Sequence, residues 1–407
     1  MSDKWLYSDI VDLAMFVNDM SGSLVDVTAP DGSPGKAFVP APLPDDMPAL
    51  SASTILEVAE ARAALAALDS TSAHLPDPTL LRAPTLRREA QATSALEGTY
   101  APLRKVLTAD ADEPATLDLV EILNYERMAN YGFGWVGDGR PITTAFLEDL
   151  HGILMRGTPL AGGSGRLRDT QVVIGKRAGG AAHSNPLAAA RFVPSPPGDH
   201  LKAGLDRLVG WMRQDHRARV DPVVATAMSH YQLETLHPFI DGNGRLGRLL
   251  IVLHLQSIGV LTEPTLTVSS WFEARRTDYY DHLLAVSARG DWDPFIGFFA
   301  AGLRASAEST RTQMRALVEV QAELADVVGG SNLRSANARA LVDLAVASPS
   351  FTVRQVEARL GISYGRANAL ISQLMGLGIL DVVDEKAYKR IFFAPRVIDV
   401  LTGESGK

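Results

Sequence analysis

The sequence predicts a mainly α-helical protein with more than one domain. Its 407 residues exceed what one ordinary hydrophobic core holds, which suggests two or three domains. Alanine and leucine are abundant and runs of β-branched residues are few, a composition that favours helix. Several stretches also place apolar residues three and four positions apart, the spacing of one helix face.

Charge and cysteine content exclude several classes of chemistry. A net charge of −8 argues against broad electrostatic binding to nucleic acid, although a local basic face is compatible with it. The absence of cysteine rules out disulfides, thiolate catalysis and cysteine-ligated zinc. The N-terminus shows no signal peptide, and no apolar run is long enough to span a bilayer. We therefore expect a cytoplasmic protein with no membrane partner.

The N-terminal part alternates extended and helical stretches. Residues 20–48 are rich in Pro, Gly, Asp and Ser, which predicts extended chain along the surface. A helix is expected from about Ser51. A Pro-rich break (HLPDPTLLRAP) separates it from a second helix, for which Gly98 is the expected C-cap.

The middle of the chain predicts helices interrupted by one hairpin. Amphipathic helices are expected between residues 115 and 155, with a cap at Thr143–Thr144. A short β-like run at Thr170–Ile174, then glycine-rich sequence and Arg191–Pro194, predict a β-hairpin. Arg168 precedes this hairpin and is predicted to be a solvated charge.

The chemically most informative stretch is His237–Arg248, which reads HPFIDGNGRLGR. A helix-like run with Asp221 as its expected N-cap precedes it, and the apolar run LLIVLHLQSIGVL follows it at helical spacing. The stretch is therefore predicted to be a loop between two core helices, with Gly242–Gly244 at the N-terminus of the second. His230 and His254, on these helices, are interpreted as packed side chains, since no spacing indicates a metal site.

Such a position suits phosphate groups, because the first amides of a helix lack internal partners and the helix dipole favours anions. Asn243 tolerates the turn conformation, and Arg245 and Arg248, three apart, can fork onto phosphate oxygens. Asp241 can hold a Mg²⁺ that bridges two phosphates, and His237 can act as general base for a hydroxyl nucleophile. The residues thus predict phosphoryl or nucleotidyl transfer; a helix–turn–helix corner with a buried histidine is the alternative.

The same stretch resembles the conserved loop of Fic (filamentation induced by cAMP) proteins, HxFx(D/E)GNGRxxR, with every fixed position present. The resemblance implies transfer of AMP from ATP to a Tyr, Thr or Ser hydroxyl of a target protein. It implies that His237 deprotonates this hydroxyl and that Asp241 binds Mg²⁺. Glycine at 244 favours AMP transfer, because the Doc-type kinase branch has lysine at this place. The positions that the resemblance assigns to nucleotide binding in the loop are Gly242, Asn243, Gly244, Arg245, Leu246, Gly247 and Arg248, the last for the γ-phosphate.

A second part of the resemblance lies ahead of the loop. Thr93 and Glu97 are four apart on one helix face and Gly98 follows, which resembles the inhibitory motif (S/T)xxxE(G/N) of Fic proteins. The resemblance implies that Glu97 pairs with Arg248 and occupies the γ-phosphate position, since a carboxylate satisfies the same guanidinium fork. ATP would then bind only in a non-productive pose. A solvated glutamate near a helix end is the alternative.

Two further segments follow the Fic pattern. The predicted hairpin lies where the family carries a flap that registers a target's backbone by strand addition, although a plain surface hairpin is the alternative. Tyr280, which follows Arg275 and Arg276, resembles the tyrosine that borders the adenine; aromatic packing is the alternative. The resemblance covers roughly residues 1–305.

The C-terminal residues predict a separate small domain. A helix over 300–326 ends in a glycine-rich hinge at 328–331, and residues 331–396 predict helix, helix, turn, helix and hairpin. This order resembles a winged helix-turn-helix, and nine Lys/Arg against five Asp/Glu give these residues a net charge of +4. DNA is therefore a candidate partner, and protein docking or dimerisation is the alternative. The residues expected on the recognition helix and wing are Tyr364, Arg366, Asn368, Lys386, Lys389 and Arg390.

Together these observations predict a mainly α protein, a Fic-type helical bundle with a β-hairpin flap and a C-terminal winged helix-turn-helix. The expected activity is Mg²⁺- and ATP-dependent AMP transfer to a partner protein or to the chain itself, and a homodimer is a further expectation. AMP removal at the same site, another nucleotide donor and a nucleotide-sensing DNA-binding regulator are the alternatives. The expected divisions are an N-terminal helical region (1–114) with the inhibitory helix at about 86–98, a catalytic core (115–305), a linker helix and hinge (306–330) and the winged domain (331–407).

Overall fold

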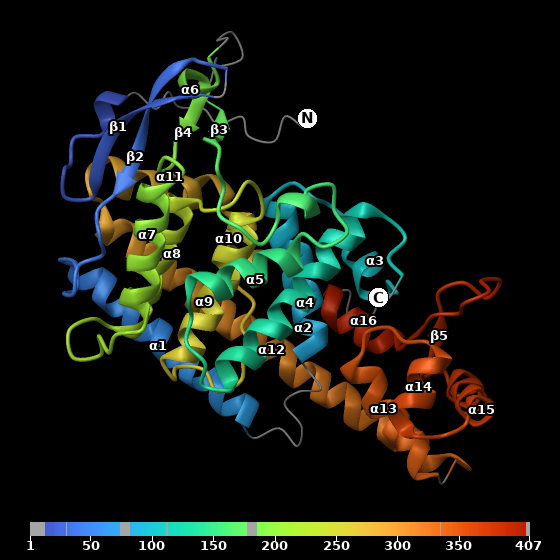
Figure 1. Ribbon diagram of the computed structural model, residues 1–407. Coiled ribbons are helices and arrows are strands. Elements are labelled where there is room, and N and C mark those ends of the chain that lie inside the picture. The colour runs from blue at the N-terminus through green and yellow to red at the C-terminus, as the bar shows by residue number, and fades with distance from the viewer. Residues whose placement is uncertain are drawn as a thin grey trace.

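The structure, a computed structural model, describes residues 13–29, 31–73, 82–110, 113–176, 185–333 and 335–403. The N-terminal residues 1–12, most of the predicted Pro-rich break (74–81) and the centre of the predicted hairpin (177–184) lie outside these ranges. The described part is mainly helical, as the composition predicts (Figure 1). Two hairpins lie at one end of the molecule, and the C-terminal helices lie at the opposite end.

The N-terminal segment forms a hairpin, whereas its composition predicted only extended chain. After a short 3₁₀ turn, η1 (Leu13–Met15), strand β1 (Gly22–Thr28) pairs antiparallel with β2 (Pro34–Pro40). Proline is tolerated in this sheet because Pro34 and Pro40 stand at the ends of β2. Strand pairing is a non-local contact, so a composition rich in Pro and Gly does not reveal it.

Two long helices form one side of the body. α1 (Ala52–Ala73) packs along α12 (Trp292–Gly330), which runs for 39 residues without a break. The hinge predicted at 328–331 is helical up to Gly330, because Val328 is buried and continues the packed face of α12. The domain divisions proposed from the sequence stay predictions.

The centre of the molecule is formed by α8 (Pro222–Leu236) and α9 (Asn243–Ser257). Every residue of α8 is buried, and α9 is buried from Asn243 to Leu255. Predicted caps are present: Asp221 caps α8, and Thr143 caps the neighbouring helix α5. Because both central helices are surrounded, their ends and the loop between them are firmly placed. The helices that pack against them include α4 (Leu117–Gly137), α5 (Thr144–Leu154), α7 (Asp199–Met212) and α11 (Arg276–Arg289), and α10 (Ser269–Ala274) packs against α11 and α12.

The predicted inhibitory helix is α2 (Arg82–Leu96), which begins and ends earlier than the predicted range of about 86–98. Its last turn tightens: the amide of Glu97 donates to the carbonyl of Ser94 (3.1 Å), and that of Gly98 to Ala95 (3.0 Å). Gly98 takes a left-handed conformation (φ 82°), as expected of a C-cap glycine. Glu97 therefore lies in the turn just past α2. The short helix α3 (Leu103–Leu107) follows.

The predicted second hairpin is present as β3 (Ile174–Lys176) paired with β4 (Ala190–Phe192), although β3 begins only at the end of the run predicted at Thr170–Ile174. The 3₁₀ turn η3 (Ala161–Gly163) lies ahead of it, and α6 (Pro186–Ala189) leads into β4. The N-terminal hairpin packs against it, since the amide of Phe38 donates to the carbonyl of Val193 (2.8 Å). The two hairpins therefore support each other.

The C-terminal residues form helix, helix, turn, helix and hairpin, the order predicted from the sequence. Thr352 makes a capping box with Gln355, Gly361 turns the chain with φ 62°, and Ser363 caps the third helix. The winged helix-turn-helix interpretation stays a prediction. The elements are α13 (Ala336–Ala347), α14 (Val353–Leu360), α15 (Tyr364–Gly376), β5 (Asp381–Val382), β6 (Phe392–Phe393) and α16 (Pro395–Thr402).

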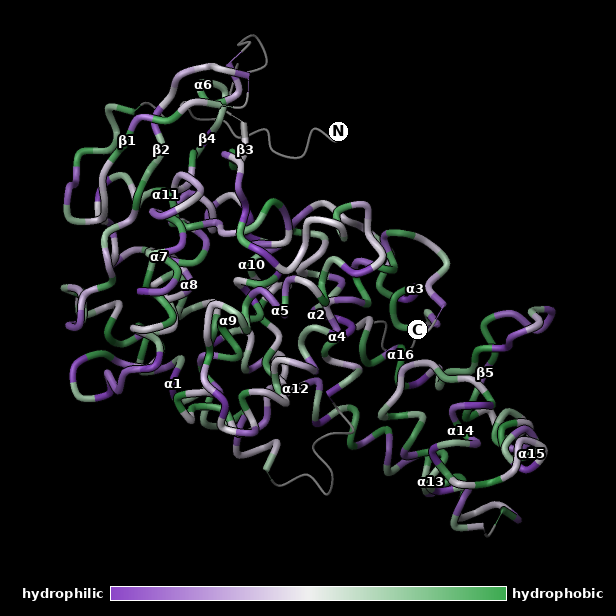
Figure 2. The backbone as a smooth tube through the Cα atoms, in the orientation of Figure 1, coloured by the Kyte–Doolittle hydropathy of each residue, from purple (hydrophilic) through white to green (hydrophobic). Residues whose placement is uncertain are grey.

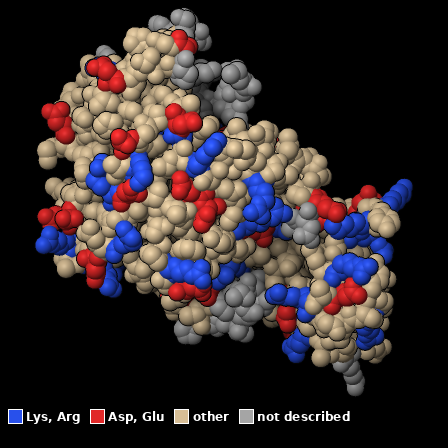
Figure 3. All heavy atoms as spheres, in the orientation of Figure 1, with Lys and Arg blue, Asp and Glu red and all other residues tan. Residues whose placement is uncertain are grey.

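Hydrophobic and hydrophilic residues are mixed along most helices, as expected where one face of a helix packs inward (Figure 2). On the face shown in Figure 3, basic and acidic side chains are interspersed over the body, and basic ones are frequent over the C-terminal helices. Within the described residues, no helix is both long enough and apolar enough to cross a bilayer.

Candidate active site

The stretch His237–Arg248 joins α8 to α9, as the sequence predicts. His237 follows the last residue of α8 in a left-handed conformation (φ 50°, ψ 62°). It is the only non-glycine residue with positive φ among the described residues. Such a conformation is costly for a histidine and persists only when the surroundings hold it. The surroundings of His237 therefore hold its backbone, and the held backbone fixes the direction of the imidazole.

The loop is closed by Asn243, which lies at the start of α9. Its side chain accepts a hydrogen bond from the amide of Phe239 and donates one to the carbonyl of the same residue, both at 2.8 Å. Gly242 precedes it with φ 79°, and a Cβ atom there would collide with Met155. Asn243 therefore shapes the loop through its side chain, and the backbone amides of the first turn are the groups available to an anion.

The imidazole of His237 has a defined tautomer. Its Nδ1 lies 3.3 Å from the carbonyl oxygen of Glu234, which can only accept, so Nδ1 carries the proton. Burial, together with the charge of Arg168, lowers the pKa of His237 to about 4, although Glu97 and Asp241 oppose this shift. At neutral pH the ring is therefore uncharged and its Nε2 is free to accept a proton.

Arg248 and Glu97 form the ion pair that the sequence implied. Arg248 Nη2 lies 2.6 Å from Glu97 Oε1, and its guanidinium also donates to Thr93 Oγ1 (2.8 Å) and to the Thr93 carbonyl (3.1 Å). The Arg248 side chain is fully buried, and that of Glu97 is 19% exposed. Burial would raise the pKa of Glu97, but the charge and hydrogen bond of Arg248 outweigh it and lower the pKa. Glu97 is therefore ionised.

Gly244 provides the room for this carboxylate. A Cβ atom at position 244 would collide with Glu97 Oε1 and would lie 2.9 Å from Arg248 Nη1. Nη1 of Arg248 and Nε of Arg245 are buried and make no hydrogen bond among the described residues. Buried donors without partners are costly, so the cradle beside Gly244 fits an anion with several acceptor oxygens.

Other predicted nucleotide-binding residues fall into two groups. Arg245 faces the loop, where it contacts Glu121 (3.2 Å) and Asp241 (3.4 Å). Leu246 is buried in the core, and a Cβ atom at Gly247 would collide with Glu234. These last two positions do not line the pocket. They pack α9 against the rest of the protein. Arg245 and Arg248 do not line the pocket either, whereas Gly242, Asn243 and Gly244 do.

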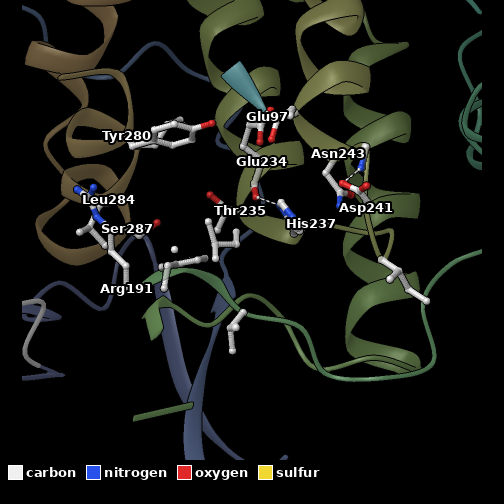
Figure 4. A pocket seen from close by; sticks show the side chains of 18 residues that line it. Glu97, Arg191, Glu234, Thr235, His237, Asp241, Asn243, Tyr280, Leu284 and Ser287 are labelled. Carbon is white, nitrogen blue, oxygen red and sulfur yellow. Dashed lines mark hydrogen bonds between the residues drawn. The ribbon is translucent and has the colours of Figure 1, made fainter. Parts of the chain in front are cut away.

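A pocket opens between the loop, the β3–β4 hairpin and α11. His237 and Asp241 lie on one side of it, Tyr280 lies across from them, and Glu97 lies between (Figure 4). The structure thus brings the predicted base, metal ligand, inhibitory glutamate and aromatic residue into one cavity. The residues that line it from the hairpin and α11 include Ile174, Arg191, Phe192, Leu283, Leu284 and Ser287.

Sequence reasoning missed two buried groups beside this pocket. His151 on α5 lies 3.1 Å, through Nε2, from the carbonyl of Asp241 and accepts at Nδ1 from the amide of Gly165 (3.0 Å). Glu234 lines the pocket, and burial raises the pKa of its carboxyl to about 7, although Arg248 opposes this. Both are single residues on apolar helices, and no local pattern marks them.

The prediction for Arg168 was wrong. Arg168 is only 3% exposed, and its side chain donates to backbone carbonyls around the His237 loop. The sequence around it is polar and glycine-rich, which indicated a solvated loop. Tertiary contacts with the end of α8 bury it.

Fold and site together show a helical protein in which the uncharged His237 and the glycine-rich start of α9 line one pocket. Residues 55–134 match the family model described as Fic/DOC family N-terminal, and residues 141–255 match the Fic/DOC family model. Over these two segments the chain therefore matches the Fic/DOC family, which confirms the resemblance found in the sequence.

The chain is also similar to proteins of known name. It is 36% identical to the protein adenylyltransferase Fic of Drosophila ananassae and 34% identical to that of Drosophila melanogaster, in each case over 122 residues. These matches cover 30% of this chain and 23% of each relative, so the chain matches about a quarter of their length. A Fic family protein from Desulfovibrio desulfuricans G20 has a similar fold, with a TM-score of 0.54 and 22% identity over 86% of this chain and 98% of that one.

Proposed function

We propose that the protein is an Mg²⁺-dependent adenylyltransferase that transfers AMP from ATP to a hydroxyl side chain of a target protein. The observation that carries this proposal is the uncharged His237, with Nε2 free, beside the anion cradle of Gly244 and Arg248. The Fic/DOC match and the names of the Drosophila relatives support it.

The proposed reaction uses these residues in three roles. His237 Nε2 takes the proton of the target hydroxyl as its oxygen attacks the α-phosphorus of ATP. The bond between the α-phosphorus and the bridging oxygen breaks, and pyrophosphate leaves with the electron pair. Arg245 and Arg248 stabilise the charge that develops on the phosphates, together with the first amides of α9. The product is a phosphodiester on the target.

The remaining pocket residues are assigned by position. The Gly242–Gly244 turn would hold the α- and β-phosphates, and Arg248 the γ-phosphate. Tyr280 lies across the pocket from these groups, where the adenine would lie (Figure 4). In the structure the Glu97 carboxylate is paired with the guanidinium of Arg248, so we propose that the protein is self-inhibited through this ion pair.

The residues fit an Mg²⁺ ion that is shared with the nucleotide. The described residues contain no cluster of three or more His, Cys, Asp or Glu side chains that could hold a metal alone. Mg²⁺ bound with ATP needs only one or two protein carboxylates, because phosphates and water complete its shell. Asp241, whose side chain is half exposed beside the cradle, would hold it. The ion would neutralise charge on the phosphates.

Asp241→Asn is expected to raise the Mg²⁺ concentration that half-saturates ATP binding by about tenfold or more, because even outer-shell partners of metal ligands contribute about 10–100-fold. Calorimetry of ATP binding at varied Mg²⁺ measures this effect, and binding in EDTA serves as the control. Equal Mg²⁺ dependence in both proteins would remove Asp241 from the metal site.

The proposed function is tested with ATP labelled on the α- or the γ-phosphate. Purified Glu97→Gly protein with Mg²⁺ and a cell lysate should transfer the α-label, and not the γ-label, to protein. Transfer of the γ-label instead would indicate phosphoryl transfer. Transfer of neither label by any variant that lacks Glu97 would contradict the proposal.

AMP removal at the same site is the second candidate. It is favoured by the ionised carboxylate of Glu97 inside the pocket, where it could orient a water molecule. Release of AMP from a pre-modified protein would detect it.

DNA binding, a homodimer and a cytoplasmic location stay predictions. For the DNA-binding regulator, the predicted wing residue Lys389 is engaged by two acidic residues of the same chain, Asp110 and Glu113. Retention on DNA without any nucleotide turnover would favour that alternative.

A further inference from the structure

We propose that Arg168 is a positioning residue for His237, and that it ties the backbone of His237 to both ends of the β3–β4 hairpin. The inference rests on the proposed role of His237 as the base. No motif in the sequence marks Arg168, and its role follows from its contacts alone.

Arg168 is buried, and each of its hydrogen bonds ends on a backbone carbonyl. The central contact is from Nε to the carbonyl of His237, at 2.8 Å. The described residues show no acidic side chain paired with it. The other carbonyls that it contacts are those of Thr170 (3.1 Å, from Nη1), Leu236 (3.4 Å, from Nη2), Ser195 (from Nη2) and Pro238 (3.0 Å, from the Arg168 amide).

These contacts explain how His237 keeps a strained backbone. The last carbonyls of α8 have no partners within the helix, and a guanidinium at a helix C-terminus satisfies them and complements the dipole. Arg168 does this for Leu236 and His237 together. Without Arg168, the left-handed backbone at His237 (φ 50°) would lose this restraint, and the imidazole would no longer be held in one orientation.

The same guanidinium holds the base of the hairpin that lines the pocket. Thr170 precedes β3 and Ser195 follows β4, so Arg168 contacts the chain on both sides of the hairpin. Gln171 adds a bond from its Nε2 to the carbonyl of Pro194 (2.9 Å). A displacement of the hairpin would therefore be transmitted to the backbone of His237.

Arg168 also acts on His237 through its charge. The charged groups that face the imidazole are Arg168, Glu97 and Asp241, and the Glu234 carbonyl accepts from its Nδ1. Burial is the largest cause of the low pKa of His237 and the charge of Arg168 is the second, whereas the two carboxylates raise this pKa. Removing the Arg168 charge must therefore raise it. The low pKa keeps the base uncharged.

The experiment separates the charge of Arg168 from its hydrogen-bonding fork. In a Glu97→Gly background, Arg168→Gln removes both, while Arg168→Lys keeps the charge and loses the fork. Arg166→Gln is the matched control, since Arg166 is exposed and lies two residues away. The measurements are the pH dependence of kcat/KM for AMP transfer and an NMR titration of the His237 imidazole.

We expect Arg168→Gln to shift the His237 titration, and the acid limb of kcat/KM, upward by about 1 pH unit, the low end of the effect of a nearby charge. The neutral ring is the active form, so the rate rises with pH through this pKa. Both Arg168 variants should lower kcat by roughly 10–100-fold with little change in KM for ATP. Arg168→Lys should not shift the acid limb of kcat/KM, because it keeps the positive charge.

Two outcomes would overturn the inference: an unshifted His237 titration in Arg168→Gln, or a kcat equal to that of Arg166→Gln. The NMR titration needs no turnover. A protein without transferase activity would therefore contradict the proposed function and still leave Arg168 testable.

Separate contacts lead to a second inference, which also rests on the proposed self-inhibition. We infer that the C-terminal helices clamp the inhibitory helix α2. Arg87, in the middle of α2, is buried and donates from Nη1 to Ser350 Oγ (3.0 Å), between α13 and α14. Ser350 Oγ donates in turn to the carbonyl of Ala109 (2.9 Å), and Arg87 bonds the carbonyl of Leu107 (2.9 Å). One buried network thus joins α2 to the C-terminal module.

The β5–β6 hairpin adds a polar contact to this clamp. Lys389 Nζ lies 2.5 Å from Asp110 and 3.1 Å from Glu113, both in the segment after α3. Arg104 of α3 also lies over the ring of Phe393, at 5.6 Å. The placement of α2 decides whether Glu97, one residue past its end, reaches Arg248. A ligand that binds Lys389 in place of Asp110 and Glu113 would therefore weaken the contact with α2 and favour release of Glu97 from Arg248.

The test removes the ion pairs of Lys389 and the hydrogen bonds of Ser350 in the full chain. Lys389→Glu with Ser350→Ala should raise basal AMP transfer by about fivefold or more, the lower end of an allosteric coupling, and speed hydrogen exchange of α2 amides. Lys386→Glu with Ser348→Ala is the control: the described residues show neither an ion pair of Lys386 nor a side-chain hydrogen bond of Ser348.

In a Glu97→Gly background the same pair of substitutions should add nothing to the rate, because the inhibitory carboxylate is already absent. Unchanged exchange in α2 would overturn the clamp. Faster exchange without added transfer would show that α2 is clamped and that its release does not control activity.

Discussion

Glu97→Gly is expected to raise the rate of AMP transfer by about 10–100-fold, within the range of allosteric couplings of about 1–3 kcal/mol. In the structure the Glu97 carboxylate lies 2.6 Å from the guanidinium of Arg248 and against Gly244. In the proposed ATP complex this is the place of the γ-phosphate. Removal of the carboxylate leaves Arg248 buried without its anion, so ATP gains the interaction that Glu97 now makes. Steady-state transfer of α-labelled AMP measures the change.

Two controls distinguish charge from space at position 97. Glu97→Gln keeps the size of the side chain and one acceptor but removes the charge, so its rate should lie between wild type and Glu97→Gly. Thr93→Ala removes the hydroxyl that accepts from Arg248 Nε and leaves the carboxylate, so inhibition should weaken only slightly. Equal transfer by wild type and Glu97→Gly would contradict self-inhibition through this ion pair.

His237→Ala in the Glu97→Gly background is expected to lower AMP transfer by about 10²–10⁴-fold, the range of general base catalysis. ATP binding should be unchanged, because the phosphate cradle comes from α9 and its arginines. The Nδ1 contact with the Glu234 carbonyl and the pKa of about 4 leave Nε2 as the acceptor, so no other protonation state needs to form first. Single-turnover transfer and the Kd for ATP are the two measurements.

His237→Asn is the appropriate control, because asparagine tolerates the left-handed backbone that His237 adopts and alanine does so at a cost. If the loss reflects the missing base, both variants should lose activity equally. If His237→Asn retained full transfer, the base would have to be another group, and Glu234, with a pKa of about 7, would be the next candidate.

Local signals explain which parts of the fold were predictable. The caps at Thr143, Asp221 and Thr352 and the spacing of apolar residues act within one or two helical turns, and the corresponding helices formed where expected. The hairpin of β1 and β2 was missed because pairing depends on a partner strand and on the neighbouring β4. The unbroken course of α12 through Gly330 was missed because glycine is tolerated where Val328 is buried.

The same distinction applies to the site. The loop residues stand together in twelve positions, and the Fic pattern linked them to Thr93 and Glu97, about 150 residues away, before any contact was known. Arg168 and His151 carry no pattern. Each is an isolated polar residue whose partners, the carbonyls of His237 and Asp241, come from a distant segment.

The sequence by itself determined the helical class, the loop between two core helices and the chemistry of its residues, because these depend on residue type and short spacing. Tertiary structure alone decided the tautomer and low pKa of His237, the burial of Arg168, the turning of Leu246 and Gly247 away from the pocket and the contact between α2 and the C-terminal helices. These features arise from burial and from hydrogen bonds between distant segments, which no local pattern of residues contains.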